Sequence, residues 1–445
     1  MDTAKKTIAL ISPRRSLWSK NSRIKAVFER NKEFLKTWYS PSLSLLTIAA
    51  VTPARYGIEL IDEEFETIDF QRKYDIVGIS AMTQQASRAY EIADRYRSLG
   101  VTVAMGGIHA TVLPEEALKH VDSVVVGEGE GLWKKFLHDW ENGSILRRYE
   151  NPPGFSTCLE DSPVPRYDLV KKDHFSENKG YFHMIPIQAT RGCPHDCCFC
   201  IVSRIYGKKI RKKNNTQIIN ELKRIRELFC NQLILFTDDN LFVDKSYTKI
   251  LMKEMEPLKV HWVGQSDISV ADDDELLRSA YQSGCMMLLI GFESLNQKSL
   301  EGINTNHWKM NQSKKYKEAV KKIQEHGIIV HAAFVVGFDE DDQSVFTKIR
   351  DFSIANHCTG QYTILTPIPG SRQYEELRKE KRLLKEVFWD ECNFFNVVFR
   401  PKMMTAEQIE NGLVRLYNKL FSQSEFLKRA KYMKAIYKKM LLRQT

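Results

Sequence analysis

Three closely spaced cysteines constrain this chain more than any other feature of its sequence. Cys193, Cys197 and Cys200 stand in the segment RGCPHDCCFC, directly after the apolar run FHMIPIQAT. One short loop can therefore aim three thiolates at one point. Three thiolates are one ligand short of a closed structural metal site, and the open coordination position is where chemistry takes place. The spacing, with an aromatic residue before the last cysteine, predicts an iron–sulfur cluster.

Two other uses of these cysteines stay open at this point. A disulfide within the triplet would leave one cysteine over, and a zinc site would need a fourth ligand. Cys198 directly follows Cys197, so the two side chains should diverge, and we expect Cys198 to be a small buried or half-exposed residue. His195 is the better candidate for a fourth zinc ligand.

Composition and cysteine usage predict a cytoplasmic protein. The first residues, MDTAKKTIALISPRR, are too polar for a signal peptide, and no apolar run approaches the roughly 18 residues of a membrane span. The nine cysteines, most of them isolated, fit a reducing compartment. The net charge of +10 weakly favours an anionic partner, but aromatic residues are not interleaved with the basic runs, so we expect no nucleic acid.

Residues 1–145 are predicted to form an open, doubly wound α/β domain. Five apolar runs, KTIALIS, GIELID, YDIVGIS, TVAMGG and SVVVGE, read as strands that are buried on both faces, and segments with helical periodicity separate them. The ligand of such a domain lies beyond the carboxyl ends of its strands. Residues 146–180 are polar and rich in proline, which indicates a linker or a strap across a cleft.

Residues 181–370 are predicted to form a partial (β/α)6 barrel, and residues 371–445 a helical C-terminal domain. Six strand–helix units follow one another, and polar side chains collect just past the strand ends, which is the active face of such a barrel. A single aspartate at a strand end can equally cap the next helix. Repetition over four strands favours a site, with the polar residues Asp238, Asp239, Gln265, Ser266, Asp267, Glu293, Ser294 and Asp339.

The cysteine loop resembles the signature of the radical S-adenosylmethionine enzymes, with Phe199 as the usual aromatic residue. In that family three cysteines hold a 4Fe-4S cluster, whose unique iron chelates S-adenosylmethionine. An electron from the cluster splits this cofactor into methionine and a 5′-deoxyadenosyl radical. The resemblance implies that Cys193, Cys197 and Cys200 bind the cluster. It implies further that S-adenosylmethionine is held by Asp238, Gln265 and Glu293.

The first domain is similar to the cobalamin-binding domain of the cobalamin-dependent radical enzymes. The similarity lies in residues 42–50, 106–111 and 127–130, and in a serine two residues before Met82. Glycine lets a backbone approach a bulky ligand closely. The Asp-x-His-x-x-Gly motif of classical corrinoid enzymes is missing, so bound cobalamin should lack a protein histidine from that motif. The resemblance implies cobalamin contacts for Ser80, Met82, Gly106, Gly107, His109 and Glu128.

The resemblance spans nearly the whole chain. Residues 389–405 are similar to the tail of enzymes that methylate hopanoids and related lipids. One departure is the segment 302–308, where relatives usually carry a lysine-rich Asn-Lys-x-x-Asn run. The implied reaction is cobalamin-dependent methylation of an unactivated carbon of a small-molecule or lipid-like substrate, with an electron donor such as flavodoxin or ferredoxin.

Alternatives remain for the reaction. A radical enzyme with this layout can also close a ring, rearrange a skeleton or couple two carbons without methyl transfer, and a corrinoid- or metal-binding sensor is a third possibility. No residue is assigned as catalytic. For His109, His183 and His331 we expect structural roles, with His109 as the best exception.

The last expected helix has an apolar stripe among basic residues. Such a helix can lie on an anionic membrane surface. A helix that packs on the barrel and leaves its basic face in water explains the same pattern, and we favour this second interpretation. The stripe consists of Phe426, Ala430, Met433, Tyr437, Met440 and Leu441.

Overall fold

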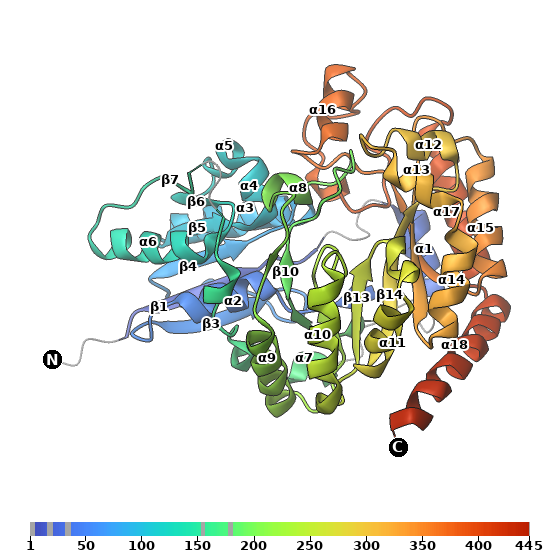
Figure 1. Ribbon diagram of the computed structural model, residues 1–445. Helices are drawn as coiled ribbons and strands as arrows, with labels where there is room; N and C mark the ends of the chain where they lie inside the picture. Colours follow the sequence, from blue (N-terminus) through green and yellow to red (C-terminus); the bar gives the residue numbers. More distant parts are fainter. Residues whose placement is uncertain (1–4, 16–20, 32–36, 153–155, 177–180, 445) are drawn as a thin grey trace. The chain divides into compact units, whose positions relative to one another are not determined.

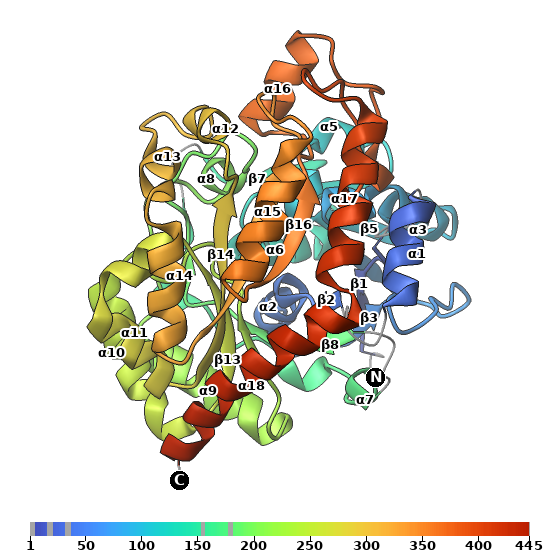
Figure 2. The same ribbon diagram turned by 90° about the vertical axis from the view of Figure 1, so that its right-hand side faces the viewer.

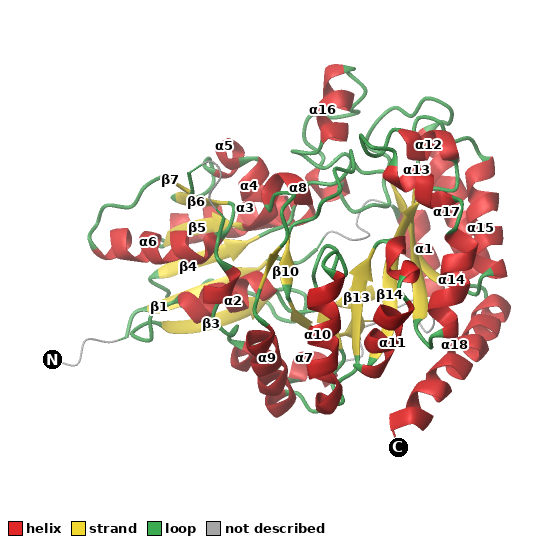
Figure 3. Ribbon diagram, in the orientation of Figure 1, coloured by secondary structure: helices red, strands yellow, loops and turns green. Residues whose placement is uncertain are grey.

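The computed structural model describes residues 5–15, 21–31, 37–152, 156–176 and 181–444. They form two compact units, and each unit is built on a parallel six-stranded sheet. We name them the front unit (residues 1–17, 41–177 and 387–393) and the barrel unit (residues 18–40, 178–386 and 394–445). Figure 3 shows the strands of both units in yellow among red helices.

The sheet of the front unit has the strand order β3-β1-β4-β5-β6-β7. The five expected strands are confirmed, and the segment expected as a linker adds the sixth, β7. The interiors of β1 and β4 are fully buried, as their continuous apolar runs predict. The strands are β1 (Thr7–Ser12), β3 (Gly57–Asp62), β4 (Ile76–Ser80), β5 (Thr102–Gly106), β6 (Ser123–Val126) and β7 (Arg148–Glu150), and the longest helices are α2 (Leu43–Val51), α3 (Ala86–Ser98) and α6 (Gly129–Glu141).

The sheet of the barrel unit has the order β16-β15-β14-β13-β12-β9, with every neighbouring pair parallel. This order follows the chain, which confirms the partial β/α barrel. All six carboxyl ends therefore meet at one edge. The strands are β9 (Ile185–Ile187), β12 (Ile234–Phe236), β13 (Trp262–Ser266), β14 (Cys285–Glu293), β15 (Ile329–Val336) and β16 (Thr359–Ile364).

Helices follow the barrel strands, and several begin with a side-chain cap. Asn214 and Gln217 form a reciprocal capping box at the start of α9, and Thr405 and Gln408 do the same for α17. In Figure 2, α15 and α17 lie side by side, and α17 packs on β16 while α15 packs on β15. The helices are α9 (Asn215–Leu228), α10 (Lys245–Met255), α11 (Asp274–Gln282), α13 (Trp308–Ser313), α14 (Tyr316–Glu325), α15 (Ser344–Ala355), α16 (Arg372–Lys379), α17 (Ala406–Leu420) and α18 (Gln423–Gln444).

Two segments cross from one unit to the other in a way that the sequence did not predict. From the N-terminal region, α1 (Ser22–Arg30) packs on α17, and β2 (Thr37–Tyr39) pairs with β8 (Tyr181–His183) in the barrel unit. In the opposite direction, the short helix η6 (Trp389–Glu391) belongs to the front unit.

The first half of α18 packs on the barrel unit. Arg429 is buried and donates a hydrogen bond to the carbonyl of Cys358, while the Tyr432 hydroxyl donates to Gln324 Oε1 at 3.1 Å. These contacts support the packed interpretation as far as Ile436, and the side chains of Tyr437, Met440 and Leu441 lie outside the described residues. In the described parts of the chain, no helix is long and apolar enough to cross a membrane.

Candidate active site

The predicted site residues of the barrel unit lie at the carboxyl ends of adjacent strands. The cysteine loop follows β9 and the two-residue strand β10 (Thr190–Arg191), which pairs with β11 (Arg211–Lys212). Asp238 follows β12, Gln265 lies on β13 and Glu293 ends β14. Because these strands are neighbours in one parallel sheet, the fold brings all of these residues to one edge.

The three cysteines of the loop are half-buried, and their thiols lie close enough to affect one another. Burial raises the pKa of all three, that of Cys200 to about 11, and the negative charges of Cys193 and Cys200 raise the pKa of Cys197 further. A thiolate here is costly unless a cation compensates it, and a bound metal supplies that charge. Every one of the nine cysteines is a free thiol, which removes the disulfide alternative.

Both candidates for a fourth protein ligand make contacts with residues outside the cysteine triplet. Cys198 is 6% exposed, as expected, and its Sγ lies 3.4 Å from Gln373 Oε1. His195 Nε2 lies 3.0 Å from Asp267 Oδ2. Among the described residues, no three His, Cys, Asp or Glu side chains are arranged to hold a single metal ion. In a 4Fe-4S cluster each thiolate binds a different iron, so the donor set of three cysteines fits this group.

A buried ion pair lies beside the cysteine loop. Lys309 Nζ, on α13, donates to Glu293 Oε1 at 3.0 Å and to the Gly291 carbonyl at 2.6 Å. Burial opposes the charge of Lys309, but Glu293 and Cys197 outweigh it and raise the pKa of the ammonium above its ordinary value. The barrel edge therefore holds one fixed cation and one fixed anion next to the thiols.

The two adjacent aspartates after β12 have different environments. Both carboxylate oxygens of Asp238 accept hydrogen bonds, from the amides of Ala189 and Thr190 and from the Thr190 hydroxyl. Asp238 thus anchors the start of the cysteine loop, and its contact to a ligand stays a prediction. Asp239 Oδ2 is buried and has no hydrogen-bond partner in the described chain, and burial together with Asp238 raises the pKa of Asp239 to about 7.

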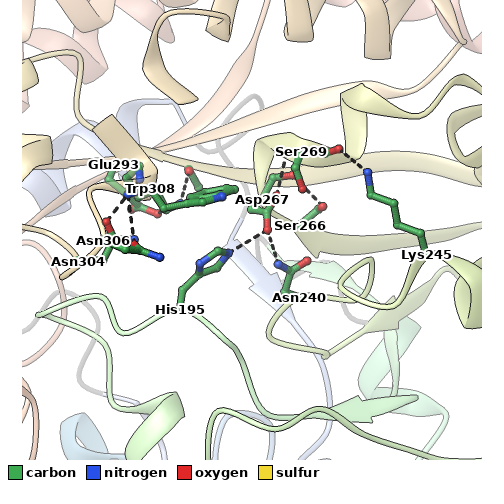
Figure 4. Close-up of polar contacts among 12 residues, drawn as sticks. His195, Asn240, Lys245, Ser266, Asp267, Ser269, Glu293, Asn304, Asn306 and Trp308 are labelled. Carbon is green, nitrogen blue, oxygen red and sulfur yellow. Dashed lines mark hydrogen bonds and ion pairs between the residues drawn. The ribbon is translucent and has the colours of Figure 1, made fainter. Parts of the chain in front are cut away.

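A polar clamp holds the middle of the cysteine loop (Figure 4). Asp267, just past β13, accepts from His195 Nε2, from Asn240 Nδ2 at 2.6 Å and from the Ser269 amide at 2.8 Å. The Trp308 ring covers His195, with 4.3 Å between the ring centroids. Burial would raise the pKa of Asp267, but these hydrogen bonds outweigh it and hold the pKa well below its usual range.

Sequence reasoning missed Lys309 and the partnership of His195 with Asp267. Lys309 directly follows the segment 302–308, and no sequence pattern connects it with Glu293. Asp267 stood among the strand-end polar residues, and only the folded chain shows that His195 is its partner.

The front unit gathers small residues at the corresponding edge of its own sheet. Ser80 pairs in register with Gly106, and hydroxyl contacts of 3.0 and 2.9 Å connect Ser80 through Ser44 to Ser42. Gly107 has φ +89°, and a Cβ on it would lie 2.8 Å from the Ala81 carbonyl and 2.9 Å from Ser80 Oγ. This position therefore requires glycine, because the turn after β5 packs directly against Ser80 and Ala81.

The remaining predicted contacts of the front unit lie at or near the same edge. Met82 lies two residues after Ser80 and is 46% exposed, a high value for a large apolar side chain. Glu128 precedes α6, after β6. Two adjacent glycines, a chain of short hydroxyl side chains and an exposed methionine suit a bulky, partly apolar ligand such as cobalamin.

His109 lies behind this edge in a buried network rather than on the surface. Its Nε2 is 2.7 Å from the Tyr90 hydroxyl and 3.6 Å from Glu116, and the Trp389 indole donates to Glu116 at 2.6 Å. Burial would raise the pKa of Glu116, but hydrogen bonds from His109, Trp389 and Tyr90 hold it below its usual value. These contacts fit a structural histidine, and a cobalamin contact for His109 stays a prediction.

The other two histidines lie in the barrel unit. His331, on β15, is 9% exposed and packs against Trp38, and burial lowers its pKa to about 4. His183 contacts the ring of Tyr39. Both environments fit the structural roles that we expected.

Comparison with known proteins identifies the family. Residues 40–136 match the B12 binding domain, residues 187–352 the radical SAM superfamily and residues 372–444 a domain of unknown function, DUF4070. The chain is 30% identical over 406 residues to the bacteriochlorophyllide d C-12(1)-methyltransferase of Chlorobaculum tepidum, covering 88% of this chain and 84% of that one. The chain belongs to the cobalamin-dependent radical S-adenosylmethionine methyltransferases.

Two further similarities agree with this family. The hopanoid C-2 methylase of Rhodopseudomonas palustris (strain TIE-1) is 25% identical over 372 residues, which cover 78% of this chain and 66% of the methylase. The structure of the cobalamin-dependent S-adenosylmethionine radical enzyme OxsB has a TM-score of 0.70 at 14% identity, covering 99% of this chain and 71% of that one. The fold of this radical S-adenosylmethionine methyltransferase is thus shared along its whole length.

The family defines the class of enzyme and its cofactors. Its members methylate carbon with a 4Fe-4S cluster, S-adenosylmethionine and cobalamin, and this methyltransferase has both of the domains that these cofactors require. The relatives named above act on small molecules.

Proposed function

We propose that this enzyme methylates an unactivated carbon of a hydrophobic, polycyclic small molecule. One observation supports the proposed type of reaction. Three free thiols and the Lys309–Glu293 ion pair lie together at the carboxyl edge of the parallel barrel sheet. Two relatives support the substrate class, because bacteriochlorophyllides and hopanoids are both rigid and largely apolar ring systems.

Within the barrel unit, the thiolates of Cys193, Cys197 and Cys200 hold the cluster. The amino-acid part of S-adenosylmethionine carries one positive and one negative group. We assign its carboxylate to Lys309 and its ammonium to Glu293 and the free Oδ2 of Asp239, with Gln265 near the ribose. When bound, the cofactors supply a 5′-deoxyadenosyl radical and a transferable methyl group, while the protein orients them and excludes water.

Within the front unit, the edge at Ser80, Met82, Gly106 and Gly107 contacts cobalamin, with Glu128 as a further contact. Support comes from the small residues that meet at this edge, because Gly106 and Gly107 carry no side chain and Ser80, which pairs with Gly106, carries only a short hydroxyl group. The enzyme works in the cytoplasm and receives electrons from a carrier such as flavodoxin or ferredoxin.

Anaerobic reconstitution tests the proposal. The purified enzyme, loaded with iron, sulfide and hydroxocobalamin, should show the broad visible absorption of an iron–sulfur cluster together with corrin bands. With S-adenosylmethionine whose methyl group is deuterated, extracts rich in polycyclic lipids and pigments should yield 5′-deoxyadenosine and a deuterated product. If neither absorption appears, the proposal is wrong. If 5′-deoxyadenosine forms without any methylated product, the enzyme is a cyclase, mutase or coupling enzyme instead.

A further inference from the structure

A dense group of cations directly follows the cysteine loop. Residues 204–213, which include α8 (Val202–Ile205) in part and β11, contain six basic residues and no acidic one. The proposed function makes no use of this group. Its members differ in exposure, and the difference separates structural cations from surface cations.

The cations at the end of the run have structural roles. Lys213 is 5% exposed and lies 2.5 Å from the buried Glu221, and Lys212 lies 2.6 Å from Asp244. These pairs fix β11 to α9 and α10. They contribute no free positive charge to the surface.

The cations at the start of the run face water. Arg204 and Lys209 are exposed and have no acidic partner among the described residues, and the Arg204 guanidinium donates one hydrogen bond to the carbonyl of Gly370. The side chain of Lys208 is 62% exposed and is 3.5 Å from its nearest carboxylate, Asp196. We call Arg204, Lys208 and Lys209 the basic hairpin surface.

The backbone beneath the basic hairpin surface contacts the cysteine loop directly. The amide of Cys193 donates to the carbonyl of Gly207 at 3.3 Å. Gly192 has φ +104°, and a Cβ on it would lie 2.6 Å from the carbonyl of Lys209. Only glycine permits this approach. One hydrogen bond therefore separates the first cysteine from the backbone under the exposed lysines.

We propose that the basic hairpin surface is the docking site of a small acidic electron-carrier protein. The inference rests on the proposed function, since the acceptor is the cluster held by Cys193, Cys197 and Cys200. The carrier loses one electron and the cluster gains it, with no transfer of atoms. Electron transfer weakens steeply with distance, so a carrier must dock where the cluster loop approaches the surface.

The charge of this surface suits such a partner better than it suits a nucleic acid. Complementary charge accelerates the encounter of two proteins and permits a small, short-lived interface. A nucleic-acid site needs more cations and stacking aromatic rings. Tyr206, which lies within the run, already contacts the guanidinium of Arg191, and the ring of Tyr247 lies against Lys212.

Stopped-flow reduction of the reconstituted holoenzyme tests the proposal, with an acidic flavodoxin in its hydroquinone form as the carrier. Lys209→Glu removes no described contact, and at low salt it should slow second-order cluster reduction on the order of fivefold. Added salt should slow the wild-type reaction and narrow this difference. Reduction by dithionite, iron content and the EPR spectrum should be unchanged.

Lys223→Glu is the matched control. Lys223 lies on the exposed face of α9, makes no described side-chain contact and undergoes the same change of charge. Figures 1 and 2 show α9 well away from α8 within the barrel unit. Reduction of this variant by flavodoxin should match that of the wild type. The double variant Lys208→Gln/Lys209→Gln, which avoids a new carboxylate, should be slowed by a smaller factor.

Several results would overturn the docking site. Equal rates for Lys209→Glu and the wild type would do so, as would equal slowing in the Lys223→Glu control. Loss of RNA binding in Lys209→Glu with unchanged reduction would identify a nucleic-acid surface instead. If the wild type holds no cluster at all, the proposed function fails first, and dithionite reduction shows this before any carrier is added.

Discussion

The carboxyl edges of the two sheets in this enzyme offer different kinds of groups for ligand binding. At the front edge, Ser80, Gly106 and Gly107 offer hydroxyls and bare backbone. At the barrel edge, Glu293, Lys309 and Asp239 offer charges that are buried or nearly so. Both edges belong to parallel six-stranded sheets, so the architecture does not cause the difference.

The contrast follows from the ligands. A large macrocycle gains affinity from the area that it buries against the protein, and small side chains allow it to approach the backbone closely. A small zwitterion gains affinity through a few fixed charges in an environment without water, where each electrostatic interaction is strong. Four substitutions can break or sharpen this contrast.

Removal of one cysteine should have the largest effect. Cys197→Ala takes away one of three cluster ligands, so we expect complete loss of 5′-deoxyadenosine formation and of the cluster EPR signal. Cobalamin binding, measured by corrin absorbance after gel filtration, should persist because the front edge is intact. Cys198→Ala is the control, since its Sγ contacts Gln373, and it should keep the cluster. If Cys197→Ala also loses cobalamin, ligand binding at the front edge depends on the barrel edge, which contradicts the prediction.

Breaking the buried ion pair should have the next largest effect. Lys309→Gln leaves Glu293 buried beside the thiols without its cation, which costs about 3 kcal/mol. The metal-free protein should therefore unfold at lower urea concentration, and the KM for S-adenosylmethionine should rise at least about tenfold. Lys298→Gln, at an exposed site on α12 (Gln297–Glu301), is the matched control. A normal KM in Lys309→Gln would remove Lys309 from the binding site.

A methyl group at the front edge should have a smaller effect. Gly107→Ala forces an alanine into φ +89° and against the Ala81 carbonyl, which costs about 1–3 kcal/mol. Cobalamin affinity should fall about tenfold in equilibrium dialysis, while cluster content stays normal. Gly131→Ala is the control, because a Cβ there meets no atom within 4 Å, and helix α6 should be unchanged or slightly stabilised. Unchanged affinity in Gly107→Ala would show that cobalamin does not approach this backbone.

The pH dependence of stability should show the smallest effect. Burial raises the pKa of Asp239 in the folded protein to about 7, above its unfolded value, so the folded state binds the proton more tightly. The stability that this provides is complete below the unfolded pKa and is lost as pH rises through about 7. Asp239→Asn should therefore flatten the decline in stability of the metal-free protein between pH 5 and pH 8.

Asp342→Asn provides the comparison for that measurement. The hydrogen bond from Ser344 lowers the pKa of Asp342, which is exposed, so its effect has the opposite sign and lies at lower pH. If Asp239→Asn and the wild type decline equally in urea titrations at each pH, the proton on Asp239 does not contribute.

The sequence predicted what local patterns encode. Buried parallel strands are continuous apolar runs, so β1, β4 and β14 were recognisable, and the spacing of Cys193, Cys197 and Cys200 identified the loop. The pairing of Lys309 with Glu293 was not predictable, because it depends on how α13 folds back over β14. Likewise, β7 is too short for a periodic pattern, and nothing in residues 387–393 indicates that they join the front unit.

The contact between Trp389 and Glu116 has a consequence for how such enzymes are assembled and re-engineered. The chain enters the front unit, leaves it, returns, leaves again and comes back at η6 before it ends in the barrel unit. A gene fragment for residues 1–145 would encode a sheet whose Glu116 lacks its indole donor. The two halves are therefore not interchangeable cassettes, and a swap of cofactor domains between relatives has to carry the stretch around Trp389 with it.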